Sequence, residues 1–264
     1  MELELKDKVV VVTGAAGIEG SIGHTIVMAL AKEGAIPVIV CRNDRGYSYE
    51  KELREKGIPA LFVKTDLSDH EQIERAVNTI GKHYGKIDAI VNNVGVNDGA
   101  GLDAPMEDFM YSLKLNLVSY YAMVKYALPL LKSAKGTILN IGSKVALTGQ
   151  GKTSGYAAAK GGILGLTREW AVDLLPFGIR CNALIIAESY TPAYERWIGT
   201  MENGAEKLRA IKDKIPFENR MTTPLEIADT CLFIISNRSS HTTGQFLFVD
   251  GGYVHLDRAL LSVK

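Results

Sequence analysis

Three side chains in the middle of this chain could exchange a proton with a bound substrate: Ser143, Tyr156 and Lys160. Tyr156 and Lys160 are four residues apart, so on a helix they lie on one face. A phenol has a reference pKa of about 10. A cation one helical turn away favours the phenolate, so we expect Lys160 to lower the pKa of Tyr156 toward the working range. Ser143 follows the apolar run 137–141, a predicted buried strand, and would hold the substrate oxygen on which charge changes.

A glycine-rich turn near the start of the chain could hold a diphosphate. The β-branched run 9–12 predicts a strand that is covered on both faces, and residues 13–23 connect it to an amphipathic helix ending near residue 33. Glycines let the backbone approach phosphates, and a helix N-terminus supplies free N–H groups and a positive dipole. This order predicts a dinucleotide cradle formed by Gly14, Gly17, Ser21 and Ile22.

The residues after the second and third predicted strands would contact the adenosine end of such a cofactor. An acidic residue at the end of the second strand favours NAD, but the run 36–40 is followed by Cys41 and Arg42, with Arg45 close behind. Arginine pairs well with a ribose phosphate, so we predict NADP, with NAD possible. The alternative is that these arginines belong to a solvated loop. Asp66 follows the predicted strand 60–65 and could accept a hydrogen bond from the adenine amino group.

Strand and helix patterns alternate along the whole chain in units of about 30 residues, without linkers. This alternation predicts an α/β fold, with residues 1–264 forming a single domain built on a doubly wound parallel sheet of about seven strands with helices on both faces. A long helix is expected at about 105–132, kinked or ended by Pro129. Asn116 inside it is expected to be a surface or packing residue; the alternative is a helical bulge whose freed carbonyl holds a water.

Two later segments have less regular roles. Residues 187–215 carry Tyr190, Tyr194 and Trp197, and we expect them to form a substrate lid or, alternatively, a cap on the core. The predicted helix 154–174 is rich in alanine and glycine, which suits close packing between subunits.

Composition excludes several classes of partner. Thirty basic and thirty acidic residues cancel, which argues against a nucleic-acid or anionic-membrane partner. The start lacks the apolar core of a signal peptide, and no apolar run approaches the length of a membrane helix. Three widely spaced cysteines fit a reducing cytoplasm, and five scattered histidines show no metal-ligand spacing, so we expect no metal. A cytoplasmic protein is predicted.

Taken together, the motifs resemble those of the short-chain dehydrogenase/reductase family. The matching residues are Thr13-Gly14, Asp66, Asn92-Asn93-x-Gly95, Asn116, Ser143, Tyr156-x-x-x-Lys160 and Asp250-Gly251-Gly252. The resemblance implies a Rossmann-type fold, a nicotinamide cofactor and a homotetramer built on the long central helices. It implies that Tyr156 is the general acid/base, that Lys160 lowers its pKa and binds the nicotinamide ribose, that Ser143 orients the substrate, and that Asn116 holds a relay water. The cofactor contacts that it adds are Leu67, Asn93, Gly95, Tyr156, Lys160, Ala187 and Thr191.

Two segments depart from the family pattern. The glycine turn is three residues longer than T-G-x-x-x-G-x-G, as in enoyl reductases, although those enzymes space the tyrosine and lysine more widely. The Pro-Gly that normally follows the sixth strand is replaced by Ile186-Ala187-Glu188.

Finer features resemble bacterial L-fucose dehydrogenases, which oxidise the anomeric carbon of an aldose to a lactone. The similar segments are residues 94–98, 143–151, 239–245 and 249–260. A sugar needs several polar partners, and an apolar substrate would leave such groups unpaired at a cost. The residues predicted to bind the sugar are Asn97, Asp98, Ser143, Lys144, Gln150, Tyr156, Glu188 and Trp197. The alternatives are a reductase of another carbonyl, such as a 3-oxoacyl thioester or a keto-sugar acid, and a non-catalytic NADP-sensing protein.

Overall fold

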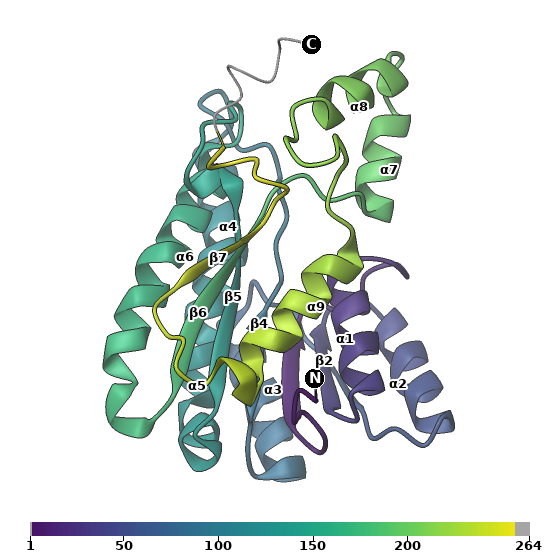
Figure 1. Ribbon diagram of the computed structural model, residues 1–264. Helices are drawn as coiled ribbons and strands as arrows, with labels where there is room; N and C mark the ends of the chain where they lie inside the picture. The colour runs from purple at the N-terminus through teal and green to yellow at the C-terminus, as the bar shows by residue number, and fades with distance from the viewer. Residues whose placement is uncertain (1, 257–264) are drawn as a thin grey trace.

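A parallel sheet forms the centre of the molecule. The computed structural model describes residues 2–256, and within them seven strands pair side by side in the order β3-β2-β1-β4-β5-β6-β7 (Figure 1). Every pairing is parallel. The strand order reverses direction between β1 and β4, which confirms the predicted doubly wound sheet. The strands are β1 (Val9–Thr13), β2 (Ile36–Cys41), β3 (Leu61–Lys64), β4 (Ala89–Asn92), β5 (Thr137–Ser143), β6 (Arg180–Ile186) and β7 (Phe246–Val249).

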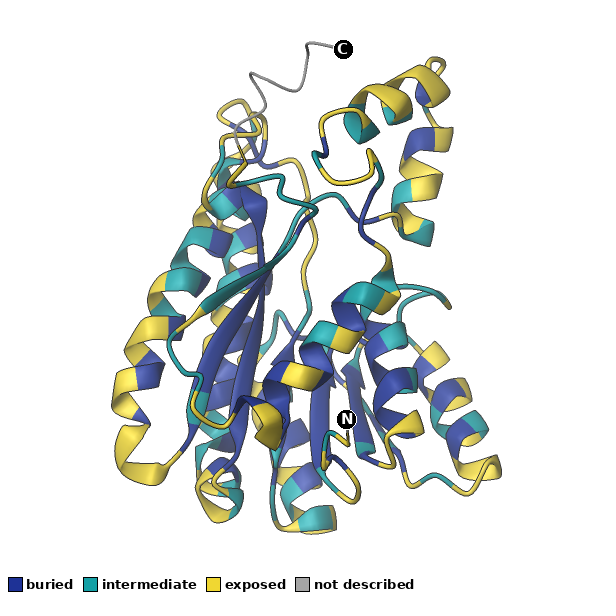
Figure 2. Ribbon diagram, in the orientation of Figure 1, coloured by how far each residue is buried: buried dark blue, intermediate teal, exposed yellow. Residues whose placement is uncertain are grey.

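Helices cover both faces of this sheet, as predicted. One layer contains α1 (Ile22–Lys32), α2 (Arg45–Glu55) and α9 (Pro224–Ile235); the other contains α3 (His70–Tyr84), α5 (Ser119–Ala134) and α6 (Ser154–Asp173), against which α4 (Met106–Leu113) packs. The alternation of β1 shows how the layers form. Val10 and Val12 pack toward α1 and α9, whereas Val9 and Val11 pack toward α3 and α5. All four are buried, as are most residues of the central strands (Figure 2).

The expected helix 105–132 is present as an unbroken helical segment from Met106 to Ala134, but it is not α-helical throughout. Between α4 and α5 the backbone widens into one turn of π-helix, Lys114–Val118, and α5 then continues past Pro129 to Ala134. Of the two expected effects of Pro129, a kink or an end of the helix, the second was therefore wrong. Buried Met123, Ala127 and Leu131 hold α5 against the sheet, which offsets the backbone hydrogen bond that a proline removes.

Residues after β6 form more regular structure than the sequence indicated. Two helices, α7 (Pro192–Gly199) and α8 (Gly204–Lys212), lie beyond the carboxyl ends of the strands, at the upper right of Figure 1. Thr191 begins α7, because its hydroxyl accepts a hydrogen bond from the Tyr194 N–H and Pro192 occupies the first turn. Across residues 2–256, none of the helices combines the length and apolar character that crossing a bilayer requires.

Candidate active site

The loops that follow β1 and β4 are tied together at the carboxyl edge of the sheet. The Thr13 hydroxyl accepts hydrogen bonds from the backbone N–H groups of Asn93 (2.9 Å) and Val94 (3.1 Å), and the Asn93 amide donates to the Thr13 carbonyl (2.9 Å). Gly14 has a φ of +68°, and a Cβ there would lie 2.8 Å from the Val94 Cα. Glycine is required at this position because the two backbones approach so closely.

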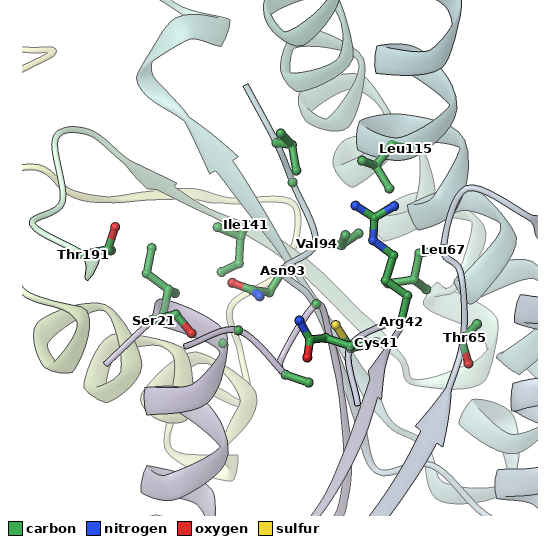
Figure 3. Close-up of a pocket in the computed structure, with 18 of the residues that line it drawn as sticks. Ser21, Cys41, Arg42, Thr65, Leu67, Asn93, Val94, Leu115, Ile141 and Thr191 are labelled. Atoms are coloured by element: carbon green, nitrogen blue, oxygen red, sulfur yellow. The ribbon is translucent and has the colours of Figure 1, made fainter. Parts of the chain in front are cut away.

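A cleft with a volume of about 370 Å³ opens at this edge (Figure 3). That volume falls within the range of roughly 300–1,000 Å³ that small-molecule sites occupy. Its walls include every residue predicted to contact the cofactor except Ala187, whose neighbour Ile186 lines the cleft instead. Figure 3 shows Ser21 and Thr191 on one side and Arg42 and Leu67 on the other.

The glycine-rich turn offers one unpaired hydroxyl group for a diphosphate. Ser21 is the N-cap of α1, and its hydroxyl is buried without a hydrogen-bond partner among residues 2–256. Two side chains brace the turn from behind: the Tyr49 hydroxyl donates to the Gly17 carbonyl (2.8 Å), and the Gly20 N–H donates to Nδ1 of His24 (3.3 Å). A buried hydroxyl beside a helix N-terminus suits an anionic group, so this end of the cleft fits the diphosphate of a dinucleotide.

The opposite end of the cleft has the polar groups that adenosine would need. Asp66 accepts hydrogen bonds from the Ser68 N–H and hydroxyl, and these bonds lower the pKa of its carboxyl, with a further contribution from Arg42. Arg42 lines the cleft, whereas Arg45 does not. The nearest acidic side chain after β2, Asp44, forms an ion pair with Lys64 (2.6 Å) on the surface.

The proton-transfer residues meet between β5 and α6. Ser143 is the last residue of β5, and its hydroxyl hydrogen-bonds to Tyr156 in the first turn of α6. The Lys160 ammonium lies 5.5 Å from the centre of the Tyr156 ring, one turn further along the same face. Both Tyr156 and Lys160 line the cleft, and Ser143 joins them through its hydrogen bond to Tyr156.

The expectation that Tyr156 has a lowered pKa was wrong for this structure. Burial raises its pKa to about 12; the hydrogen bond from Ser143 opposes this effect, and the Asp98 carboxylate adds to it. Lys160 does not counteract the shift, since burial lowers its own pKa to about 7. Its Nζ instead donates to the Ile141 carbonyl (2.8 Å) and to the Tyr120 hydroxyl (3.1 Å). Spacing alone showed the pair on one face, but not what burial does to each group.

Asn116 lies at the centre of the π-turn and is fully buried, so the expectation of a surface residue was wrong. Its amide oxygen accepts from the Val96 N–H (2.8 Å), and its amide nitrogen donates to the Val96 carbonyl (3.0 Å) and the Ser112 hydroxyl (3.2 Å). A bulge at this position was the alternative that the sequence left open. Asn116 fixes the loop that carries Val96 against the π-turn.

The residues predicted to bind a sugar are only partly gathered. Lys144 and Glu188 form an ion pair, with side chains 10% and 17% exposed. The Asn97 amide oxygen accepts a hydrogen bond from the Thr153 hydroxyl, and Asp98 lies near enough to Tyr156 to raise its pKa. Gln150 is exposed and Trp197 is 45% exposed on α7. None of these six lines the cleft described above.

The contacts of three tyrosines near the site were not assigned from the sequence, although Tyr194 was placed in the expected lid. Tyr120 bonds to Lys160, Tyr194 hydrogen-bonds to Glu188, and the Tyr253 ring lies 4.3 Å from the Lys144 ammonium. The signal for Tyr120 was its position four residues after Asn116, which places it one turn beyond that residue. Tyr194 and Tyr253 come from distant segments, so their contacts with Glu188 and Lys144 could not be read from local spacing.

Comparison with protein families identifies one matching family model. It is described as "Enoyl-(Acyl carrier protein) reductase", and it covers residues 14–254. Among curated proteins, the L-fucose dehydrogenase of Oryctolagus cuniculus is 33% identical over 93% of this chain and 84% of its own length. The 3-oxoacyl-[acyl-carrier-protein] reductase FabG of Thermotoga maritima is 31% identical, over 96% of this chain and all of its own.

The similar solved structures also include both a dehydrogenase and a reductase. The crystal structure of Cj0485 dehydrogenase superposes with a TM-score of 0.93 at 44% identity, covering 98% of both chains. The L-sorbose reductase of Gluconobacter frateurii, complexed with NADPH and L-sorbose, superposes with a TM-score of 0.91 at 25% identity, covering 97% of this chain and 100% of that one.

Proposed function

This chain belongs to the short-chain dehydrogenase/reductase family, and we propose that it oxidises the anomeric C1 hydroxyl of L-fucose or a closely related aldose to the lactone, using NADP. The family membership makes it an NAD(P)-dependent oxidoreductase. One observation carries the proposal: the Ser143–Tyr156 hydrogen bond has polar neighbours, since the Asp98 carboxylate acts on Tyr156 and Lys144, next to Ser143 in the chain, is ion-paired with Glu188. Such groups suit a polyol and are costly to leave unpaired against an apolar substrate.

In the proposed reaction each residue of the trio has a separate role. Tyr156 accepts the proton of the C1 hydroxyl, and Ser143 donates a hydrogen bond to the same oxygen, whose charge changes. Lys160 places its amino group, whose pKa burial lowers to about 7, 5.5 Å from the centre of the phenol ring, where its charged form favours the phenolate. When bound, an oxidised nicotinamide dinucleotide supplies the acceptor for the hydride from C1 and a positively charged ring that favours the phenolate. Proton and hydride together account for the two hydrogens that the aldose loses.

The assignment of NADP rests on the adenosine end of the cleft. Arg42 lines it, and Asp44, the nearest acidic residue, is paired with Lys64. A guanidinium there would bind the phosphate on the ribose, whereas an NAD site usually offers a carboxylate to the ribose hydroxyls. Gly14, Gly17, Ser21 and Ile22 would hold the diphosphate. The L-sorbose reductase complex with NADPH supports the same choice.

Other features of the proposal concern the assembly. We expect residues 187–215, with α7 and α8, to act as a substrate lid within a single domain, and α4–α6 to form subunit contacts in a homotetramer. The protein would work in the cytoplasm on a small sugar. We expect neither a nucleic-acid nor a membrane partner. The C-terminal tail, which could complete a neighbouring site, lies largely outside the described residues.

The test is nicotinamide reduction, followed by absorbance with L-fucose, D-arabinose, L-galactose and D-glucose, each with NADP and with NAD. We expect the highest kcat/KM for L-fucose with NADP. Absence of turnover on all four sugars would overturn the substrate assignment and leave the family assignment intact.

A second candidate is a reductase of another carbonyl, favoured by the acyl-carrier-protein reductases among the matches. Oxidation of NADPH by acetoacetyl-coenzyme A, a soluble 3-oxoacyl thioester, without aldose oxidation, would select it. A non-catalytic NADP sensor would bind the cofactor and turn over neither substrate.

A further inference from the structure

The buried lysine of the site lies between two tyrosines, only one of which belongs to the family motif. The centre of the Tyr120 ring is 5.1 Å from the Lys160 ammonium, and the centre of the Tyr156 ring is 5.5 Å from it. Tyr120 comes from α5, across the site from α6, and is 1% exposed. Its hydroxyl is 3.1 Å from Nζ of Lys160.

The hydrogen bonds of the Tyr120 hydroxyl can be accounted for one by one. Its oxygen is 2.9 Å from the Val94 carbonyl and 3.3 Å from the Ile141 carbonyl, and neither carbonyl can donate. A phenol has one proton to give, so that proton goes to a carbonyl and the oxygen accepts from the lysine. Burial raises the pKa of Tyr120 well above its ordinary value, which keeps it a neutral acceptor.

Lys160 has few other groups to stabilise its charge. Its side chain is 2% exposed, and no carboxylate within residues 2–256 forms an ion pair with it. Its acceptors are the Ile141 carbonyl and the Tyr120 hydroxyl. The other titratable groups facing this region are Tyr156 on α6 and Asp98 on the loop after β4, which acts on Tyr156. Each acceptor therefore matters to a buried ammonium.

We propose that Tyr120 is a positioning residue, whose hydroxyl keeps Lys160 charged and directed along the wall of the cleft for the proton transfer at Tyr156. This inference rests on the proposed function only in assigning the proton transfer to Tyr156. A purely structural role for Tyr120 would need the ring and not the hydroxyl. The hydroxyl, however, links three elements: the β4 loop through Val94, β5 through Ile141 and α6 through Lys160.

The test compares Tyr120→Phe with Tyr121→Phe. Tyr121 is the next residue, is 48% exposed and lies outside the site, so it is a matched control. Removing an acceptor from Lys160 lowers its pKa further. A charged lysine favours the phenolate that oxidation needs, so a lysine that loses its charge more easily moves the rising limb of the kcat profile to higher pH. We expect a displacement of about one unit, with about tenfold lower kcat on that limb, since one unit equals a tenfold change.

A second measurement on the same variants needs no turnover. The ¹⁵N resonance of the Lys160 side chain is followed against pH, and it is assigned by its loss in Lys160→Met. We expect Tyr120→Phe to lower the titration midpoint of Lys160 by about one unit. Tyr121→Phe should leave it unchanged. KM for the sugar should change less than twofold in both variants, since neither hydroxyl contacts substrate.

An unchanged Lys160 midpoint in Tyr120→Phe would overturn the inference, and so would a displacement of equal size in Tyr121→Phe. A displaced midpoint in a protein that oxidises no sugar would support the inference and contradict the proposed substrate. If Tyr120→Phe does not fold, 3-fluorotyrosine at position 120 retains the ring and hydroxyl but weakens the oxygen as an acceptor. It should lower the midpoint by a smaller amount, and no displacement would again overturn the inference.

Discussion

Asn116 pairs with the backbone of Val96 as a neighbouring strand would, accepting from its N–H at 2.8 Å and donating to its carbonyl at 3.0 Å. This pairing fixes the loop after β4 to the π-turn between α4 and α5. The loop then carries Asp98 close enough to Tyr156 to raise the pKa of that phenol. A helix irregularity therefore helps to set the electrostatics of the proposed catalytic residue.

Asp98→Asn should move the pH dependence of oxidation to lower pH. The Asp98 carboxylate raises the pKa of Tyr156, and oxidation needs the phenolate, so the rate rises with pH through the Tyr156 pKa. Without the Asp98 charge, the rise in rate should begin at a pH lower by roughly half a unit. The effect should be largest at low salt, because salt screens the charge of an exposed side chain. The measurement is kcat against pH at saturating sugar. Asp103→Asn, on the same loop, is the control, and an equal displacement in it would contradict the specific role of Asp98.

Tyr156→Phe should lower kcat by about 10²–10⁴-fold, the usual contribution of a general acid/base. Cofactor affinity should change little, because the ring that lines the cleft remains. Turnover and NADP affinity are measured side by side, by absorbance and by fluorescence titration. Retention of more than about a tenth of the activity would assign the proton transfer to another group.

Arg42→Ala should weaken NADP and leave NAD almost unchanged. Loss of a charge-assisted hydrogen bond of about 1.5–3 kcal/mol corresponds to roughly 10–100-fold in affinity. Arg45→Ala is a close control, since Arg45 is an exposed arginine three residues later that does not line the cleft. The ratio of kcat/KM for the two cofactors is the measurement. Equal losses for NADP and NAD would mean that Arg42 does not recognise the phosphate.

Lys160→Met should abolish activity and stabilise the fold. The folded pKa of Lys160 is about 7, below its ordinary value of 10.5, so the wild-type chain takes up a proton on unfolding between these pH values. The burial of Lys160 therefore disfavours the wild-type fold most at pH 7 and below, and this effect disappears as the pH rises toward 10.5. We expect the variant to gain about 2–8 °C in Tm at pH 7 and less at pH 10. A variant less stable than wild type at pH 7 would show that the bonds to Tyr120 and Ile141 outweigh the cost of burial.

Breaking the Lys144–Glu188 pair should destabilise the protein by more than breaking an exposed ion pair would. Both side chains are mostly buried, so removing one partner leaves an uncompensated charge, at a cost of about 1–3 kcal/mol. Lys144→Met and Glu188→Gln are each expected to lower the free energy of unfolding, and the double variant should regain part of the loss. A double-mutant cycle by urea denaturation measures the coupling.

The Lys51–Glu55 pair provides the comparison for that cycle. Its side chains are 76% and 67% exposed and 3.8 Å apart, so we expect a coupling below about 0.5 kcal/mol. Similar coupling in both pairs would mean that the Lys144–Glu188 pair is solvated in solution. An altered KM for the sugar in the single variants, with unchanged NADP affinity, would support contact with substrate.

Local patterns in the sequence determined the fold and the cofactor cleft. Buried β-branched runs such as residues 9–12, each followed by a helix pattern, were enough to predict a doubly wound parallel sheet. Such a sheet brings the ends of its strands to one edge, so the glycine turn, Arg42, Asp66 and Asn93 could be predicted to meet there. The replacement of the usual Pro-Gly after β6 by Ile186-Ala187-Glu188 could also be read from the sequence. The sequence did not show that Ile186, and not Ala187, would line the cleft.

Tertiary structure alone decided the properties that depend on burial and on contacts between distant segments. The four-residue spacing of Tyr156 and Lys160 gave their common face, but their pKa shifts follow from desolvation, which spacing does not encode. The π-turn at Asn116 depends on a partner twenty residues away, and Lys160 is held by Tyr120, forty residues earlier. The Lys144–Glu188 pair likewise joins two loops that the sheet brings together. Periodicity predicts which face of an element is buried, but only the packed chain determines which groups share that buried space and which of them remain charged.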